Sequence, residues 1–368
     1  MQRRTLMRSA GLGGGAMVAA GTLAAPAIAQ SAPELKWRLA SSFPKSLDTL
    51  YGAGEVFAKY VAEATDHRFQ IRVFASGEIV PGLQVADAIQ NGTVECGHTA
   101  GAYYVGKDPT WAFDTAIPFG TNARQQDAWI NWGGGRELLA EFYKGYNIHG
   151  MACGNTGAQM GGWFRKEIKT IDDMKGLKFR IAGLAGEVCN RVGAVSQQIA
   201  GGDIYPALEK GTIDAAEWVG PYDDLKLGFH KIAPYYYYPG WWEGGPQPSL
   251  YINLGKWNEL PKHYKAVIEA AAAKAHNLML SKYDAENPKA LRELVAAGTK
   301  LTPFPIPVME ACFNAANELY AEISAKNAKF KKIYDSWRPF RNEAILWFRV
   351  CEFTFDSFMA RQSAANKL

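Results

Sequence analysis

AIQNGTVECG at residues 88–97 and ALEKGTIDAA at residues 207–216 are two versions of one pattern, 119 positions apart in a chain of 368 residues. In each, an alanine stands four residues before a Gly-Thr pair, and a β-branched residue, an acid and a small residue come next. The pattern predicts a helix that ends at the glycine, because glycine accepts a positive φ, and a strand that starts after it. A unit used twice predicts two similar α/β lobes, and the cleft between two lobes binds small molecules.

The segments around the first repeat read as strand, helix, strand, helix and strand. Alternating apolar residues predict strands and helical spacing predicts helices, which gives the ranges 35–41, 50–64, 69–74, 81–90 and 93–98. The second half repeats this alternation of strands and helices, with strands at 177–181 and 212–216 and helices at 186–192 and 205–210. The order is typical of a largely parallel sheet covered by helices, so the predicted fold class is α/β.

After Pro261 the pattern changes to long helices, at residues 264–283, 288–297, 308–325 and about 341–360. The last of these carries the aromatic residues Trp347, Phe348, Phe353, Phe355 and Phe358 and is apolar on more than one face. Such a helix has to be covered. We expect it to pack into the protein's own core, with a second subunit as the alternative.

The first 29 residues are expected to form a leader that is removed. Arg3 and Arg4 are a twin-arginine pair, a Gly/Ala-rich run comes after them, and Ala27-Ile28-Ala29 is a small-x-small cleavage site. A transmembrane anchor is the alternative, but the run is too short and too weakly apolar to span a membrane well. We therefore expect export to the periplasm by the twin-arginine route.

The charge balance excludes one class of partner. Without the three arginines of the leader the chain keeps 37 basic side chains against 36 acidic ones, with no clustered basic block. A nucleic-acid-binding protein needs such a cluster to neutralise phosphates, so we expect no nucleic acid partner. The five cysteines cannot all pair and form no C-x-x-C motif, so we expect buried free thiols.

The sequence lacks the motifs of common catalytic sites. It contains no G-x-S-x-G, H-E-x-x-H or Walker motif, and its six histidines are scattered without metal-ligand spacing. We therefore expect a binding protein with no catalytic residues and no catalytic cofactor. A periplasmic enzyme acting on a small carboxylate is the alternative.

Arg180 and Glu217 are the charged residues most favourably placed for binding. Arg180 ends the apolar strand 177–181, and its planar guanidinium matches a carboxylate with two hydrogen bonds. An internal salt bridge to Asp203 or Glu217 is the alternative. Glu217 ends the second repeat, where the carboxyl end of a strand faces the crevice of an α/β sheet. Pairing of Glu217 with Arg180 and a binding role for both can hold together.

Two further stretches predict parts of a pocket. Asn155 and Gln159 lie in GNTGAQMGGW, where glycines let a ligand approach the backbone and amides offer neutral polar atoms; structural amides are the alternative. Gln159 and Glu217 together could offer oxygen ligands to a hard cation. YYYYPGWWEGG, residues 235–245, suggests a pocket wall around Glu243, although a core strand is the better interpretation of its four tyrosines.

GNTGAQ (154–159), KGLKFRIAG (175–183), GTIDAAEWVGP (211–221) and YYYYPGWWEGG (235–245), together with the leader, resemble a solute receptor of the tripartite ATP-independent periplasmic (TRAP) transporters. The similarity is to the DctP-type branch that includes 2-oxo acid receptors. It implies a two-lobed periplasmic binding fold, type II-like, with a ligand cleft between the lobes and long C-terminal helices. It also implies that the protein closes around a small monocarboxylate, such as pyruvate or lactate, and delivers it to the membrane permease.

The resemblance also implies roles for individual residues. Arg180 would bind the carboxylate of the ligand, and a sodium or calcium ion would bridge ligand and protein. The cation would be held by Gln159, Glu217 and the backbone carbonyl of Trp218. The remaining ligand-binding residues implied by the resemblance are Asn155, Tyr103 and Glu243 as hydrogen-bond partners, and Phe43 and Trp218 as walls.

The implied domain boundaries come from the same similarity. Residues 30–155 with about 219–255 would form the first lobe, and residues 156–218 with about 256–340 the second. The C-terminal helix 341–368 would be an element for homodimer formation. A sensor ectodomain that passes ligand status to a kinase is a further alternative, because the same fold serves both roles.

Overall fold

Two β-sheets carry the fold of the computed structural model, which describes residues 33–367. The first sheet has the strand order β2-β1-β3-β10-β4. Its strands are β1 (Leu35–Ser41), β2 (Phe69–Phe74), β3 (Cys96–Thr99), β4 (Ile148–Ala152) and β10 (Ser249–Asn253). The pairs of β1 with β2 and with β3 are parallel, as the βαβαβ order predicts, and β10 runs antiparallel to both of its neighbours.

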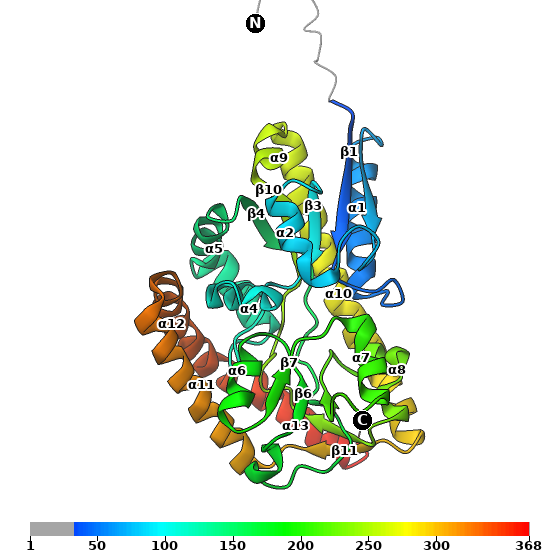
Figure 1. Cartoon of the computed structure of the whole chain (residues 1–368), viewed down its shortest axis with the longest axis vertical. Coiled ribbons are helices and arrows are strands. Elements are labelled where there is room, and N and C mark those ends of the chain that lie inside the picture. Colours follow the sequence, from blue (N-terminus) through cyan, green and yellow to red (C-terminus); the bar gives the residue numbers. More distant parts are fainter. Residues whose placement is uncertain (1–32, 368) are drawn as a thin grey trace, which may run out of the picture. The chain divides into compact units, whose positions relative to one another are not determined.

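The second sheet has the order β11-β9-β5-β8-β6-β7 and repeats the arrangement of the first. Its strands are β5 (Gly162–Phe164), β6 (Lys178–Arg180), β7 (Val195–Gln197), β8 (Ala215–Ala216), β9 (Tyr235–Tyr238) and β11 (Lys300–Pro303). Here β6 lies between parallel neighbours β7 and β8, and β5 runs antiparallel to β8. The two sheets lie at opposite ends of the view in Figure 1. The predicted two-lobed α/β class is confirmed.

The two sequence repeats have the same backbone geometry. Gly92 and Gly211 have φ values of +73° and +71°, which only glycine adopts without strain. Each stands two residues after the end of a helix, α2 (Val85–Gln90) or α7 (Gly201–Glu209). The next amide, that of Thr93 or Thr212, donates to the carbonyl oxygen of the alanine five residues earlier, at 2.8 and 3.0 Å. The repeat therefore sets the start of β3 and β8 in equivalent ways.

Helices cover the two sheets and connect them. They are α1 (Leu50–Ala64), α3 (Ala112–Thr115), α4 (Ala123–Trp132), α5 (Gly135–Lys144), α6 (Gly183–Arg191), α8 (Pro221–Leu227), α9 (Leu254–Glu259), α10 (Lys262–Ala296), α11 (Ile306–Lys326), α12 (Ala328–Val350) and α13 (Glu352–Ala364). The long α10 runs past both sheets in Figure 1.

Three of the predicted helix ranges are wrong, two because they form a single helix and one because it is divided. The ranges 264–283 and 288–297 form one helix, α10, which continues through Pro288 because buried Tyr283 on one side and Ala290 and Leu294 on the other anchor it. The range 341–360 is divided by Cys351 between α12, which begins at Ala328, and α13.

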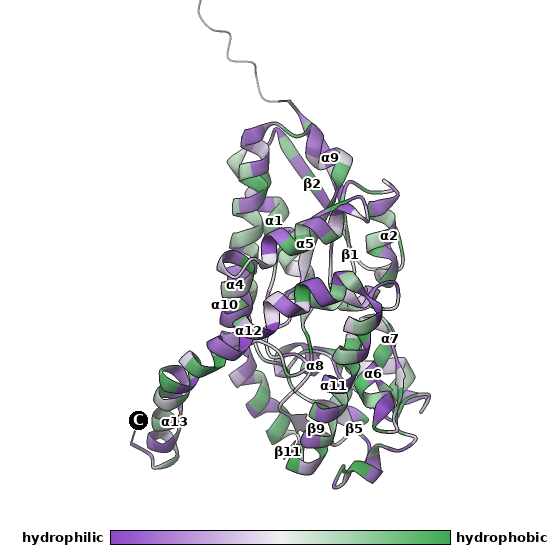
Figure 2. Cartoon of the chain, turned by 90° about the vertical axis from the view of Figure 1, so that its left-hand side faces the viewer, coloured by the Kyte–Doolittle hydropathy of each residue, from purple (hydrophilic) through white to green (hydrophobic). Residues whose placement is uncertain are grey.

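The aromatic residues of this C-terminal region are not in the core. Trp347 is 59% exposed, Phe353 is 66% exposed and α13 buries none of its residues. Figure 2 shows α13 standing away from the sheets. The expectation of core packing is therefore wrong for Trp347 and for α13, whereas Phe348 of α12 is half-buried with Arg124 of α4 lying 5.1 Å from its ring.

Two smaller expectations also need correction. Tyr235–Tyr238 forms the core strand predicted for it, but this strand, β9, pairs with β5 in the second sheet, whereas the predicted boundaries assign residues 219–255 to the first lobe. Strand pairing joins segments distant in the chain, so order in the sequence does not reveal it. All five cysteines are free, but Cys351 is exposed rather than buried.

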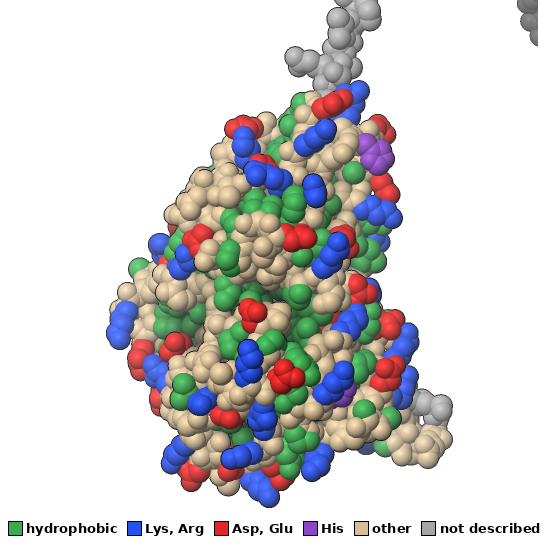
Figure 3. All heavy atoms as spheres, turned by 45° about the vertical axis from the view of Figure 1, so that its right-hand side comes forward, with side chains coloured by type: hydrophobic (Ala, Val, Ile, Leu, Met, Phe, Trp, Pro, Cys, Tyr) green, Lys and Arg blue, Asp and Glu red, His purple; other side chains and the backbone are tan. Residues whose placement is uncertain are grey.

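The surface visible in Figure 3 mixes Lys and Arg with Asp and Glu, without a large patch of either sign. Among the described residues, no helix combines the length and the apolar character that a membrane crossing requires.

Candidate functional site

A cavity of about 40 Å³ brings together most of the residues predicted to bind ligand. Its lining includes Phe43, Tyr103, Gln159, Arg180, Glu217, Trp218 and Glu243. Phe43 and Tyr103 come after strands of the first sheet, whereas Arg180 ends β6 and Glu217 comes after β8 in the second. The cavity thus lies between segments of the two sheets, where the two-lobe pattern predicts a cleft.

Arg180 and Glu217 form a buried ion pair in this cavity, each only 2% exposed. Arg180 Nη1 contacts Glu217 Oε1 and donates to the Glu217 carbonyl oxygen at 2.7 Å, while Nε donates to the Ile199 carbonyl oxygen at 3.1 Å. No hydrogen bond to a described residue uses Nη2. The internal salt bridge considered for Arg180 is therefore present, and one guanidinium nitrogen stays available for a ligand.

The carboxyl of Glu217 has one oxygen engaged and one without a partner. Its Oε1 contacts Arg180 and accepts from the backbone amide of Ala182 at 3.2 Å, and no described residue donates to Oε2. Burial raises the pKa of Glu217, although the guanidinium and the amide act in the opposite direction. A buried carboxylate with an unpartnered oxygen gains from a cation.

Two further oxygens of this cavity lack partners among the described residues. Gln159 Nε2 donates to Thr156 Oγ1 at 3.2 Å, which orients the amide, while the buried Gln159 Oε1 has no hydrogen bond. The backbone carbonyl oxygen of Trp218 also accepts none. With Glu217 Oε2 they offer neutral and anionic oxygens, the donor set that Na⁺ and Ca²⁺ prefer. The residues present therefore fit the predicted cation.

Glu243 and Tyr103 add two groups whose surroundings disfavour charge. Burial and then the nearby carboxylate of Glu217 raise the pKa of Glu243 well above its usual range, with Arg180 opposing. Burial also raises the pKa of the Tyr103 hydroxyl. These surroundings favour the neutral forms of both side chains, and in those forms both can donate a hydrogen bond.

Aromatic rings form the walls of the cavity. The Trp218 ring lies 5.1 Å from the guanidinium carbon of Arg180, close enough for a cation–π contact. The buried Phe43 ring lies 6.5 Å from that of Tyr103, and the Tyr103 carbonyl oxygen accepts from Gln198 Nε2 at 2.9 Å. This last contact joins the first-sheet side of the cavity to the segment after β7.

Asn155 is not among the residues that line the cavity. Its Nδ2 donates to the Gly245 carbonyl oxygen at 3.1 Å, and its Oδ1 accepts from the Gly157 amide at 2.8 Å. The structure favours the structural interpretation of this amide, which joins GNTGAQ to the segment after Glu243. Direct contact of Asn155 with a ligand stays a prediction.

Sequence reasoning missed Leu50, Ala102, Thr115, Thr156 and Pro246, which also line the cavity. Thr156 lies inside the GNTGAQ motif, three residues before Gln159, so the motif itself could have indicated it. The others are apolar or small and carry no signal that separates a cavity wall from the core.

A larger cavity, of about 170 Å³, lies among α4, α5, β4 and α10 and contains none of the predicted ligand-binding residues. Its polar groups include His276, whose Nε2 lies 3.0 Å from Asp127 Oδ1. Two further cavities, of about 400 and 470 Å³, also contain none of these residues, so volume does not identify the site. The convergence of unpartnered oxygens and a buried arginine favours the smallest of the four. Among the described residues, no cluster of three or more His, Cys, Asp and Glu could hold a metal ion by itself.

Two matched α/β sheets with a charged cavity between their segments define a solute-binding protein of the two-lobed type. The family model for bacterial extracellular solute-binding proteins of family 7 (DctP) matches residues 40–327. The chain therefore belongs to this solute-binding family, and the predicted DctP-type resemblance is confirmed.

Relatives are similar over nearly their whole length. The monocarboxylate 2-oxoacid-binding periplasmic protein of the cyanobacterium Nostoc is 48% identical over 360 residues, which are 97% of this chain and 99% of that protein. A TRAP transporter solute-binding protein from Bordetella bronchiseptica is 51% identical, with a TM-score of 0.90 over 91% of this chain and 99% of that one. It is described as a mixed-occupancy dimer with copurified calcium and picolinate in its active site.

A second solved relative, the TRAP periplasmic solute-binding protein of Pseudoalteromonas atlantica, holds sodium and pyruvate. It is 39% identical to this chain, with a TM-score of 0.86 over 88% of this chain and 99% of its own. The two solved relatives differ in the cation and in the organic acid that accompanies it.

Proposed function

We propose that this protein captures a small 2-oxo or 2-hydroxy monocarboxylate together with a sodium or calcium ion and delivers it to a TRAP permease. The observation that carries the proposal is the joint presence, in one cavity, of a buried arginine with an unused nitrogen and three oxygens without partners. Relatives of 39% to 51% identity that hold pyruvate or picolinate with sodium or calcium support it.

Each part of the cavity has a role in this proposal. Arg180 Nη2 and the cation share the negative charge of the ligand, which would otherwise cost several kcal/mol on leaving water. Gln159 Oε1, Glu217 Oε2 and the Trp218 carbonyl oxygen hold the cation, and an oxygen at C2 of the ligand completes its coordination. Tyr103 and Glu243 donate hydrogen bonds, and Phe43 and Trp218 exclude water.

Titration calorimetry with matched ligands tests the proposal. After removal of cations with a chelator, pyruvate and propionate are titrated with sodium, with calcium and with neither. Pyruvate is expected to bind only with a cation, and propionate, which lacks the oxygen at C2, about tenfold more weakly or worse. Equal affinity for both acids, or no binding of any small carboxylate with either cation, would contradict the proposal. Conversion of pyruvate to a product would favour a periplasmic enzyme instead.

We further propose that a second copy of this chain covers the exposed helix α13. Leu346, Trp347, Val350, Phe353 and Phe355 are each more than half exposed and continue from α12 into α13. An apolar surface of this kind is uncommon on a monomer, and the Bordetella relative is described as a dimer. Phe353→Gln with Phe355→Gln is expected to give a monomer in analytical ultracentrifugation, whereas the control Arg361→Gln is expected to leave the dimer intact. A monomeric parent protein would contradict this proposal.

The leader lies outside the described residues. We propose that it directs folded protein to the periplasm through the twin-arginine route. Replacing Arg3 and Arg4 by lysine is expected to retain the protein in the cytoplasm, and unchanged export would argue against this route.

A further inference from the structure

A second polar network lies beside the ligand cavity, and its residues come from the same two segments that form the cavity walls. Phe43 and Leu50 line the cavity from the first-sheet side, and Asp48 and Thr49 lie between them in the chain. Glu217, Trp218 and Val219 line it from the second-sheet side, and helix α8 begins directly after them at Pro221.

Helix α8 is fixed to the second sheet by a buried carboxylate. Asp224 Oδ2 accepts from Trp163 Nε1 at 2.9 Å and from the Tyr236 hydroxyl at 2.7 Å, and these two residues belong to β5 and β9. Asp224 Oδ1 accepts from the amide of Val219 at 3.3 Å. A displacement of the second sheet therefore carries α8 and the Glu217–Val219 wall along with it.

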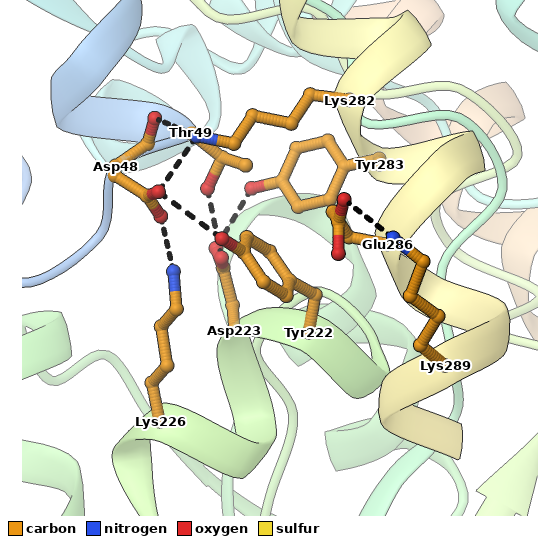
Figure 4. A network of polar contacts seen from close by, with 9 residues as sticks. All are labelled: Asp48, Thr49, Tyr222, Asp223, Lys226, Lys282, Tyr283, Glu286 and Lys289. Carbon is orange, nitrogen blue, oxygen red and sulfur yellow. Dashed lines mark hydrogen bonds and ion pairs between the residues drawn. The ribbon is translucent and has the colours of Figure 1, made fainter. Parts of the chain in front are cut away.

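The other side of α8 contacts the first-sheet segment (Figure 4). The fully buried Asp223 accepts from Thr49 Oγ1 at 2.8 Å and from the Tyr283 hydroxyl of α10 at 2.7 Å. One turn away, Lys226 contacts Asp48 Oδ1.

Asp48 receives three donors. Lys282 Nζ of α10 lies 2.6 Å from Asp48 Oδ2, and the Tyr222 hydroxyl donates to the same oxygen at 3.1 Å. Burial acts to raise the pKa of Asp48, but the hydrogen bonds from Lys226 and Lys282 outweigh it and lower the pKa to about 2. The carboxylate is therefore ionised at any pH at which the protein works, and both lysines are held by it.

We propose that Asp48, Thr49, Asp223 and Lys226 are positioning residues that hold the two walls of the ligand cavity together and so slow the release of ligand. None of the four lines the cavity. They act through the wall residues beside them in the chain, by favouring the arrangement in which both walls face the ligand. The ligand leaves only after the two walls separate, so contacts that stabilise the closed arrangement relative to the open one slow its release.

The ion pairs of Asp48 are weak enough to break and re-form as the two walls separate and close. The side chains of Asp48 and Lys226 are 49% and 29% exposed, and ion pairs of such exposure contribute little and weaken with salt. The buried Asp223–Thr49 hydrogen bond fixes where α8 contacts the first-sheet segment, whereas the ion pairs of Asp48 add a smaller, salt-dependent stabilisation to that contact. Removing the charge of Asp48 is therefore expected to change ligand release about three- to fivefold, without abolishing binding.

The inference rests on the proposed function, and stopped-flow kinetics with pyruvate and calcium test it. Asp48→Asn keeps the shape of the side chain and removes its charge. It is expected to raise the dissociation rate about three- to fivefold while the association rate changes little. Asp48→Glu is expected to recover part of the loss. Glu141→Gln is the matched control, because Glu141 forms an exposed ion pair with Lys332 at 2.7 Å between α5 and α12, away from the cavity.

A measurement without ligand separates this inference from the proposed function. Small-angle scattering of the ligand-free protein at low salt is expected to give a larger radius of gyration for Asp48→Asn than for the parent protein. Potassium chloride at high concentration is expected to bring the parent protein close to the variant. This measurement decides the inference even if pyruvate does not bind.

A stability effect alone would overturn the inference. That outcome is a lower melting temperature of Asp48→Asn with an unchanged dissociation rate and an unchanged radius of gyration. A double-mutant cycle of Asp48→Asn with Lys226→Met adds a further test. The two changes are expected to be strongly non-additive in the dissociation rate, and additivity would show that the pair does not act as a unit.

Discussion

The two halves of the molecule share an acid in their repeats and differ in the residues that come after it. Glu95 Oε2 accepts from the backbone amide of Arg38 on β1 at 2.7 Å, and Asp214 Oδ2 accepts from the backbone amide of Lys178 on β6 at 3.0 Å. The registers of the two sheets make these positions equivalent, because Leu39 pairs with Cys96 as Phe179 pairs with Ala215. The repeated acid is thus a structural device in both halves.

The proposed ligand-binding residues Arg180 and Glu217 lie two and three residues after Lys178 and Asp214. The residue equivalent to Arg180 is Ala40, and the one equivalent to Glu217 is His98, whose Nε2 contacts the Cys153 carbonyl oxygen. One sheet therefore ends in neutral side chains, with His98 bonded to the backbone, and the other ends in a charged pair within a cavity. The two halves thus share one framework, and the proposed binding role depends on the side chains at the carboxyl ends of the second-sheet strands.

The largest expected effect comes from making the second half resemble the first. Arg180→Ala is expected to weaken binding of the carboxylate by about 2 to 5 kcal/mol, because the negative charge of the ligand is then buried without its partner. Calorimetry with pyruvate and calcium measures this loss. Arg180→Lys is the control for charge without the planar fork and is expected to retain part of the affinity. Near-normal affinity of Arg180→Ala for pyruvate would show that Arg180 does not bind the carboxylate of the ligand.

The pH dependence of stability separates two buried aspartates, one beside each sheet. Burial raises the pKa of Asp114, held by Tyr143, Tyr251 and Ser249, to about 6, and that of Asp224 to about 7. The folded protein then binds protons that the unfolded chain has lost, so the free energy of unfolding falls as the pH rises from about 4 to these values.

Denaturant unfolding at several pH values measures the two contributions, about 3 kcal/mol for Asp114 and about 4 kcal/mol for Asp224. Asp224→Asn is expected to remove the fall between about pH 6 and pH 7 together with its own share of the fall below pH 6, whereas Asp114→Asn removes only a share of the fall below about pH 6. A fall that is unchanged in both variants would show that neither group titrates as described.

Glu217→Gln tests whether the negative charge at this position, where the first half has His98, holds the cation. The amide keeps an oxygen for Arg180 and for the Ala182 amide but loses the charge that attracts a cation. Affinity for the cation is expected to fall by about 1 to 2 kcal/mol, more for calcium than for sodium. Calcium titration at saturating pyruvate measures the change, and an affinity for calcium equal to that of the parent protein would show that Glu217 is not a ligand.

Much of this fold and site could be predicted from the sequence, because the repeat carries local information. Gly92 and Gly211 predict a helix-to-strand transition from local sequence alone. The charged residues at strand ends converge because parallel strands end at one edge of the sheet. Seven of the predicted site residues line one cavity for this reason.

The remainder depends on contacts between distant segments. The two ends of the Asn155 amide bind Gly245 and Gly157, and nothing local reveals that Gly245 lies beside this amide. Pro288 reads as a helix end, yet the burial of residues on both sides of it keeps α10 continuous. Trp347 and Phe353 read as core residues because apolar periodicity reports a face that requires cover, without saying what covers it.

The smallest expected effect concerns the other arginine of the comparison. Arg38 pairs with Glu95 as Arg180 pairs with Glu217, but its side chain is 47% exposed, so water already solvates the pair. Arg38→Ala is expected to change the free energy of unfolding by at most about 1 kcal/mol and to leave the affinity for pyruvate unchanged. Chemical denaturation and calorimetry on one preparation measure both quantities. A loss of affinity comparable to that of Arg180→Ala would mean that burial at the strand end does not decide which arginine–glutamate pair binds ligand.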